Sequence, residues 1–166
     1  APDRAELDPE TYWQASVKAI EEVVSRTGID KAKILALSIS SQGETLIVLD
    51  ENHRPLINAI VWVDNRATKQ AAELKERFSG EVYQVTGIPE IVPTWPACKI
   101  LWLQQESPEF FRKAKKFLLV QDYLVWRLSG NFATDGSISC TTMYYDINHH
   151  EWWESCLKAI GITPDQ

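Results

Sequence analysis

Residues 33–50 read KILALSISSQGETLIVLD, two apolar runs joined by a polar corner. The first run, 33–41, is almost continuously apolar, which is typical of a β-strand covered on both faces. A tight hairpin would carry Asn-Gly or Asp-Gly at the corner, but this chain has Gln42, Gly43 and Glu44 there. Turn chemistry does not require these long polar side chains. We therefore interpret the corner as a surface that faces a small polar ligand.

The remaining patterns predict an alternation of helices and strands. Asp8 and Pro9 are suited to begin a helix, and Gly28 is suited to end it. Consecutive strands with short connections indicate an antiparallel pair, so the predicted fold class is α/β with a mixed sheet flanked by helices. The other predicted strands are 45–50, 58–64 and 116–120, and the other predicted helices are 66–79, 97–105, 107–114, 121–130 and 150–161, with a short helix near Ser137–Cys140.

The first predicted helix carries one apolar stripe, made of Trp13, Val17, Ile20 and Val24. A helix cannot bury such a stripe alone, and the predicted strands supply only part of the sheet that it needs. We therefore expect the domain to be incomplete at its N-terminus.

Composition limits the classes of function. A chain of 166 residues, 45% hydrophobic and 24% charged, can form one domain with a core. The net charge of −6 disfavours nucleic-acid binding, and no apolar run approaches the roughly 18 residues that span a bilayer. The polar N-terminus does not resemble a signal peptide. Cys98, Cys140 and Cys156 are widely spaced, which favours reduced thiols and a cytoplasmic protein over disulfides or a zinc site.

Four stretches, in order, resemble the FGGY family of carbohydrate kinases, which includes glycerol, xylulose and ribulose kinases. Together they cover nearly the whole chain, so the resemblance is stronger than any single motif. The stretches are LDPETYWQASVKAI (7–20), ALSISSQGETLIVLDENHRPLINAIVWVDNRA (36–67), TGIPEIVPTWPACKILWLQQESPEFF (86–111) and LLVQDYLVWRLSGNFATDGSISCTTMYYDINHHEWWESCLKAIGI (118–162).

The resemblance implies a ribonuclease H-like, actin-like ATPase fold of two domains around a cleft. Residues 1–166 would be a single domain, most of the N-terminal, sugar-binding one. The strands with the phosphate loop would precede it, and the C-terminal domain with the nucleotide site and the catalytic aspartate would follow. The resemblance thus implies ATP and Mg²⁺ in the full-length enzyme, no catalytic residue or metal site in these residues, and no phosphate transfer by them alone.

The predicted substrate contacts come from the same resemblance and from hydroxyl chemistry. Each hydroxyl both donates and accepts, so a polyol needs paired polar groups such as those of Gln42 and Glu44. Gly43 makes room, which suggests a substrate other than glycerol. Asp64 would bond a hydroxyl and Arg66 would anchor the loop, and the alternative for both residues is to cap the next helix. The full predicted set is Gln42, Gly43, Glu44, Trp62, Asp64, Thr94 and Trp95.

Three further motifs have structural interpretations. Asp122 is expected to cap a helix, and Thr134-Asp135 is expected to position a loop. His149 and His150 lack a third ligand at metal-binding spacing, so a surface or capping role is expected.

The function predicted is ATP-dependent phosphorylation of a sugar or polyol hydroxyl, with a homodimer as a possible assembly. One alternative is a sugar-binding or dimerisation module without catalysis. The other is a ribonuclease H-like nuclease, in which Glu44, Asp50, Asp64 and Asp135 would gather around two Mg²⁺ ions about 4 Å apart.

Overall fold

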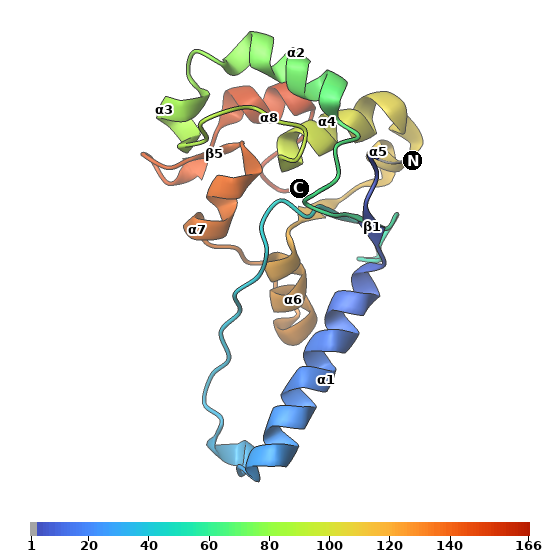
Figure 1. Ribbon diagram of the computed structural model, residues 1–166, viewed down its shortest axis with the longest axis vertical. Helices are drawn as coiled ribbons and strands as arrows, with labels where there is room; N and C mark the ends of the chain where they lie inside the picture. The colour runs from blue at the N-terminus through green and yellow to red at the C-terminus, as the bar shows by residue number, and fades with distance from the viewer. Residues whose placement is uncertain (1–2) are drawn as a thin grey trace.

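The computed structural model describes residues 3–166. It has the predicted α/β character, with short strands between helices (Figure 1). The elements are β1 (Glu6–Leu7), α1 (Pro9–Thr27), the 3-10 turn η1 (Lys31–Lys33), β2 (Ile47–Leu49), β3 (Ala59–Ile60), α2 (Thr68–Phe78), α3 (Val82–Thr86), α4 (Pro96–Glu106), α5 (Pro108–Lys113), β4 (Lys116–Leu118), α6 (Val120–Ser129), α7 (Gly136–Ser139), the 3-10 turn η2 (Cys140–Thr142), β5 (Tyr145–Asp146), β6 (Glu151–Trp152) and α8 (Glu154–Ile160).

The strands that carry the corner form antiparallel ladders. β1 pairs with β3, β2 pairs with β4, and an antiparallel bridge between Leu46 and Ile60 joins the two pairs. This bridge confirms the predicted antiparallel pair. Leu46, Ile47, Val48 and Leu49 are at most 1% exposed. The polar corner is therefore attached to one of the most deeply buried strands of the protein.

The main core lies where α2, α4 and α8 cover these strands. Phe78 at the end of α2 meets Trp153 edge to face, with ring centroids 4.8 Å apart. A second, smaller apolar cluster lies between β2, β4 and α6, and Trp13 of α1 packs against it.

Helix α1 begins and ends at the predicted residues. The Asp8 carboxylate accepts a hydrogen bond from the Glu10 amide at 2.9 Å, and Gly28 adopts the left-handed conformation that ends the helix. The apolar stripe is less well covered than its caps suggest. Within α1 only Pro9 is buried; Ile20 of the stripe is 37% exposed, and Val23, which lies outside the stripe, is 60% exposed. In Figure 1 the helix extends away from the body of the molecule.

The predicted strand over 33–41 is wrong for this structure. After η1 the chain runs without regular structure to β2, and Leu35 is 94% exposed. No backbone–backbone hydrogen bond within residues 3–166 involves 35–42. Apolar side chains favour a strand, but a strand also needs a neighbour to satisfy its N–H and C=O groups. In the described part of the chain this neighbour is missing.

The predicted helix 150–161 starts later than expected. Residues 151–152 form β6, which pairs with β5, and helix α8 begins at Glu154. The Asp146 carboxylate accepts hydrogen bonds from the Asn148 and His149 amides and folds the turn between the strands. The predicted helix start rested on helical periodicity, which does not show that the Asp146 turn competes with the helix for these residues.

Candidate functional site

The polar corner is a tight turn centred on Glu44. The Thr45 amide donates to the Gly43 carbonyl at 2.7 Å, which closes a three-residue γ-turn. Glu44 has φ of +57°, a conformation that non-glycine residues rarely adopt. At position 43, by contrast, a Cβ atom would lie 3.0 Å from the Thr141 hydroxyl, so a larger residue there would require Thr141 to shift by a few tenths of an ångström. The sequence therefore places glycine where space is short and a carboxylate where the backbone is strained.

Thr45 joins the corner to the end of β3. Its hydroxyl is fully buried and accepts hydrogen bonds from the Gln42 amide at 2.8 Å and from the Trp62 backbone amide at 3.0 Å. Gln42 also donates to the Tyr12 hydroxyl at 2.9 Å. Through the Thr45 hydroxyl, these bonds connect the Gln42 side chain to the backbone of Trp62. Trp62 is 47% exposed, so its ring is accessible to a ligand.

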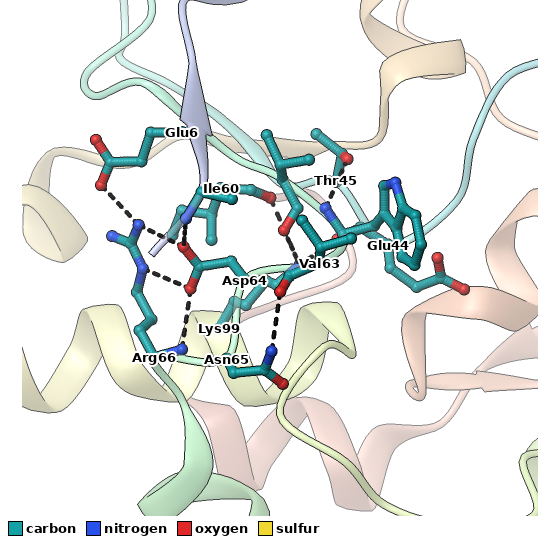
Figure 2. Close-up of polar contacts among 12 residues, drawn as sticks. Glu6, Glu44, Thr45, Ile60, Val63, Asp64, Asn65, Arg66 and Lys99 are labelled. Atoms are coloured by element: carbon teal, nitrogen blue, oxygen red, sulfur yellow. Dashed lines mark hydrogen bonds and ion pairs between the residues drawn. The ribbon is translucent and has the colours of Figure 1, made fainter. Parts of the chain in front are cut away.

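Lys99 holds the same two segments together from below. It is 0% exposed, and its Nζ donates to the carbonyls of Glu44 at 2.7 Å, Val61 at 3.0 Å and Ile60 at 3.5 Å (Figure 2). Burial lowers the pKa of Lys99 to about 8, although the nearby carboxylates of Asp64 and Glu44 oppose this shift. Burial also raises the pKa of Glu44, and Lys99 opposes that increase.

Lys99 lies within the stretch 86–111 that resembles the family, but no role was predicted for it. The available signal was its position within the apolar run PACKILWL at the start of α4. Lysine is almost never fully buried unless it is paired.

Asp64 makes its hydrogen bonds within the protein. It is 0% exposed and both carboxylate oxygens are occupied. Oδ1 accepts from the Arg66 amide and Nε at 3.0 and 2.8 Å, and Oδ2 accepts from the Arg66 guanidinium and the Ala5 amide at 2.7 and 2.6 Å. Burial would raise the pKa of Asp64, but these hydrogen bonds lower it overall. Figure 2 shows Arg66 between Asp64 and Glu6 of β1. Asp64 and Arg66 therefore anchor the loop to β1.

Thr94 and Trp95 lie at the beginning of α4, one turn before Lys99. The Lys99 amide donates to the Trp95 carbonyl at 3.2 Å, and the Trp95 indole N–H donates to the Glu90 carbonyl at 2.8 Å. Trp95 also packs against the main core. Within residues 3–166 no hydrogen bond joins Thr94 or Trp95 to the corner, so their link to the candidate site runs through Lys99.

The other predicted roles agree with the geometry. Asp122 accepts from the Leu119 amide at 2.9 Å, and Asp135 accepts from the Ser137 and Ile138 amides at 2.8 and 3.1 Å, so both carboxylates cap helices. His149 is exposed and contacts Asp146 at 2.8 Å.

The corner residues do not line either of two cavities elsewhere in the protein. One, of about 270 Å³, lies between β4, α6 and the C-terminal residues, and the other, of about 380 Å³, lies between residues 37–39 and α6. The partly exposed Trp62 and the exposed Gln42 therefore belong to a surface outside both cavities.

The carboxylates named by the nuclease hypothesis do not gather. Asp50 accepts from the Asn52 and Arg54 amides in a turn, while Asp64 and Asp135 have the partners described above. Among residues 3–166 no group of three or more metal-binding side chains is placed to hold an ion. This finding contradicts the nuclease hypothesis. Over the same range, no helix is long and apolar enough to cross a membrane.

Comparison with known proteins defines the class. The chain is 34% identical to the glycerol kinase of Thermococcus onnurineus over 166 residues, which cover 97% of this chain and 33% of that protein. It is 35% identical to the xylulose kinase of Escherichia coli K12 over 162 residues, with 98% and 33% coverage. The crystal structure of gluconate kinase from Lactobacillus acidophilus superposes with a TM-score of 0.90 at 32% identity, over 99% of this chain and 33% of that one.

These similarities identify a domain of a carbohydrate kinase. The model of the FGGY family of carbohydrate kinases, N-terminal domain, matches residues 1–166, and the chain belongs to this family. The matched kinase structures confirm the predicted ribonuclease H-like, actin-like ATPase fold. The chain spans about a third of the length of the curated relatives it matches.

Proposed function

We propose that the protein to which these residues belong phosphorylates a sugar or polyol hydroxyl with ATP, and that this chain supplies the surface that binds the acceptor. The observation that carries the proposal is the connection of the corner to the end of β3 through Thr45 and Lys99. This connection supports the proposal that Gln42, Glu44 and Trp62 contribute to one acceptor surface. The proteins most similar in sequence include kinases for glycerol, gluconate and xylulose, which supports an acceptor with several hydroxyls.

The chemistry of the corner suits such an acceptor. Both N–H groups of the Gln42 amide are used within the protein, by Tyr12 and Thr45, so its amide oxygen is the atom that can meet a substrate hydroxyl. The Glu44 carboxylate is a second acceptor, and the Trp62 ring offers an apolar face to the C–H groups of a sugar. Gly43, pressed against Thr141, sets the shape of the surface. Asp64 acts by holding the loop rather than by touching the substrate.

We further propose that residues 1–166 are most of the first domain of a longer, two-domain protein. The exposed run 34–41 and the exposed part of the α1 stripe support this organisation, because both surfaces need further chain to cover them. The nucleotide and its metal ion would be held outside these residues. The role proposed for the corner is to bind the acceptor, and this role does not require a catalytic base among residues 1–166.

Kinetics of the whole protein test the proposed function. The purified protein is assayed with ATP against a panel of polyols, pentuloses and sugar acids, and Glu44→Ala is compared with Glu51→Ala. Glu51 lies in an exposed turn outside the site and is the matched control. Loss of one hydrogen bond to a charged group, about 1.5–3 kcal/mol, should raise the acceptor KM about 10- to 150-fold and leave the ATP KM nearly unchanged.

Two results would count against the proposal. If no member of the panel accepts phosphate, the kinase assignment fails. If the acceptor KM is the same in Glu44→Ala and in the Glu51 control, the corner is not the acceptor site.

A further inference from the structure

Lys99 is the most unusual buried group outside the proposed contact set. Its side chain is fully buried, and its three ammonium hydrogens face three backbone carbonyls rather than a carboxylate. Two of these carbonyls belong to Ile60, the last residue of β3, and to Val61, which follows it. The third belongs to Glu44, at the centre of the strained turn. No other described contact joins the backbone of Glu44 to β3 in this way.

The carbonyl that Lys99 binds belongs to Glu44, whose backbone conformation is strained. A left-handed residue persists only where its surroundings hold it, and such positions cluster at binding and active sites. The γ-turn bond from Thr45 to Gly43 closes the corner locally. The Lys99 bond to the Glu44 carbonyl, at 2.7 Å, fixes the turn relative to β3 and therefore relative to Trp62.

We propose that Lys99 is a positioning residue, which holds the Glu44 turn in register with Val61 and Trp62 so that the acceptor surface is formed before the substrate binds. This inference rests on the proposed function. It adds a residue that does not touch the substrate but sets the distance between the two groups that would. Thr94 and Trp95 share the start of α4 with Lys99, so the same contact couples them to the corner.

The first test is kinetic and uses the whole protein. Lys99→Met removes the donors and the charge at similar length, and Lys99→Gln keeps two donors without the charge. Leu103→Ala is the control, because Leu103 is 1% exposed on the same helix and its loss weakens packing without touching the corner. We expect Lys99→Met to raise the acceptor KM about tenfold or more with little change in the ATP KM, Lys99→Gln to have a smaller effect, and Leu103→Ala to leave both constants within about twofold.

The second test does not depend on activity. If Lys99 holds a strained turn, loss of Lys99 lets Glu44 leave the left-handed conformation and regain the strain energy, whereas glycine at position 44 has no such strain to regain. Urea unfolding of the four proteins in a Lys99→Met and Glu44→Gly double-mutant cycle should therefore show that Lys99→Met destabilises the unaltered protein less than the glycine variant. If Lys99→Met does not fold, Lys99→Gln replaces it in both tests.

The outcomes separate the inference from the proposed function. Additive effects in the cycle, or an acceptor KM that changes equally in Lys99→Met and Leu103→Ala, would overturn the positioning role while leaving the kinase assignment intact. Absence of acceptor turnover in the unaltered protein would overturn the proposed function, and the cycle would still decide whether Lys99 holds the turn.

Discussion

Two regions of this domain differ in how completely their apolar side chains are buried. In the first, β2 and helices α2, α4 and α8 enclose a core in which most side chains are less than 5% exposed. In the second, α1 and the run 34–41 carry comparable apolar side chains, but Leu35 and Val23 are 94% and 60% exposed. In the first region the apolar side chains bury one another. In the second region they are as apolar as a core, but no described segment covers them. The candidate site lies where the two regions meet.

The largest effect expected within this comparison is the loss of a core ring. Phe78→Ala should lower the free energy of unfolding by about 3–5 kcal/mol, because it removes a large buried side chain and its contact with Trp153. Tyr83→Ala, at a residue 61% exposed, should change it by less than about 0.5 kcal/mol. Urea unfolding of the two variants measures the difference. Equal losses would mean that exposure does not distinguish the two kinds of position.

The junction between the regions should be almost as sensitive. Asp64→Ala leaves the Arg66 guanidinium, 4% exposed, without its main partner and removes the acceptor for the Ala5 amide. Breaking a buried ion pair from one side should cost about 3 kcal/mol. Glu22→Ala, which breaks the exposed pair with Arg26 on α1, should cost less than about 1 kcal/mol. Chemical denaturation of both variants tests whether the junction is held by this pair; a small loss in Asp64→Ala would show that it is not.

The contrast also explains what the sequence could predict. Asp8 and Gly28 bounded α1 correctly because capping depends on neighbouring residues. The predicted strand over 33–41 was wrong because an apolar pattern only favours a strand. Strand formation also needs pairing with a distant segment, which the described residues do not supply. The start of α8 was missed because the Asp146 turn competes locally with the helix.

The candidate site was predicted in part for the same reason. Gln42 and Glu44 come just before the buried segment that contains β2, and Trp62 comes just after β3, so the pattern could suggest that these two places lie near each other. The closure of both Asp64 oxygens by Arg66 and the Ala5 amide could not, since it needs β1 beside β3. The contacts of Lys99 required the position of α4 relative to two other segments.

The charge of Lys99 predicts a dependence of stability on pH. It is faced by Glu44, Asp64, Arg66 and Cys98, and its pKa of about 8 in the folded protein lies below the ordinary 10.5. Between these values the unfolded chain binds more protons than the folded one, so this group makes stability rise with pH. The rise from pH 8 to pH 10 should be about 2 kcal/mol larger in the unaltered protein than in Lys99→Met. Parallel unfolding curves in the two proteins would show that Lys99 titrates normally.

The exposed region makes a prediction for the whole protein. If further chain covers the run 34–41, its amides should exchange hydrogen at least about tenfold more slowly than an unstructured peptide of the same sequence. Exchange measured by mass spectrometry on peptides covering 35–41 reports this directly. Exchange at the rate of the free peptide would show that the run is unpaired in the whole protein too, and would remove the support that it gives to a second domain.

The smallest effect concerns the strain at the boundary between the regions. Glu44→Gly should stabilise the protein by about 0.5–1 kcal/mol, because relief of the left-handed penalty outweighs the greater freedom of glycine in the unfolded chain. The same change should raise the acceptor KM, since the carboxylate is lost. His150→Gly is the matched control: His150 has the same φ of +57° in an exposed turn, so it should gain similar stability without a change in KM. A gain in stability combined with a loss of binding at position 44 alone would indicate that the strain is retained for the carboxylate, because a residue kept only to form the turn would be replaced by glycine without loss.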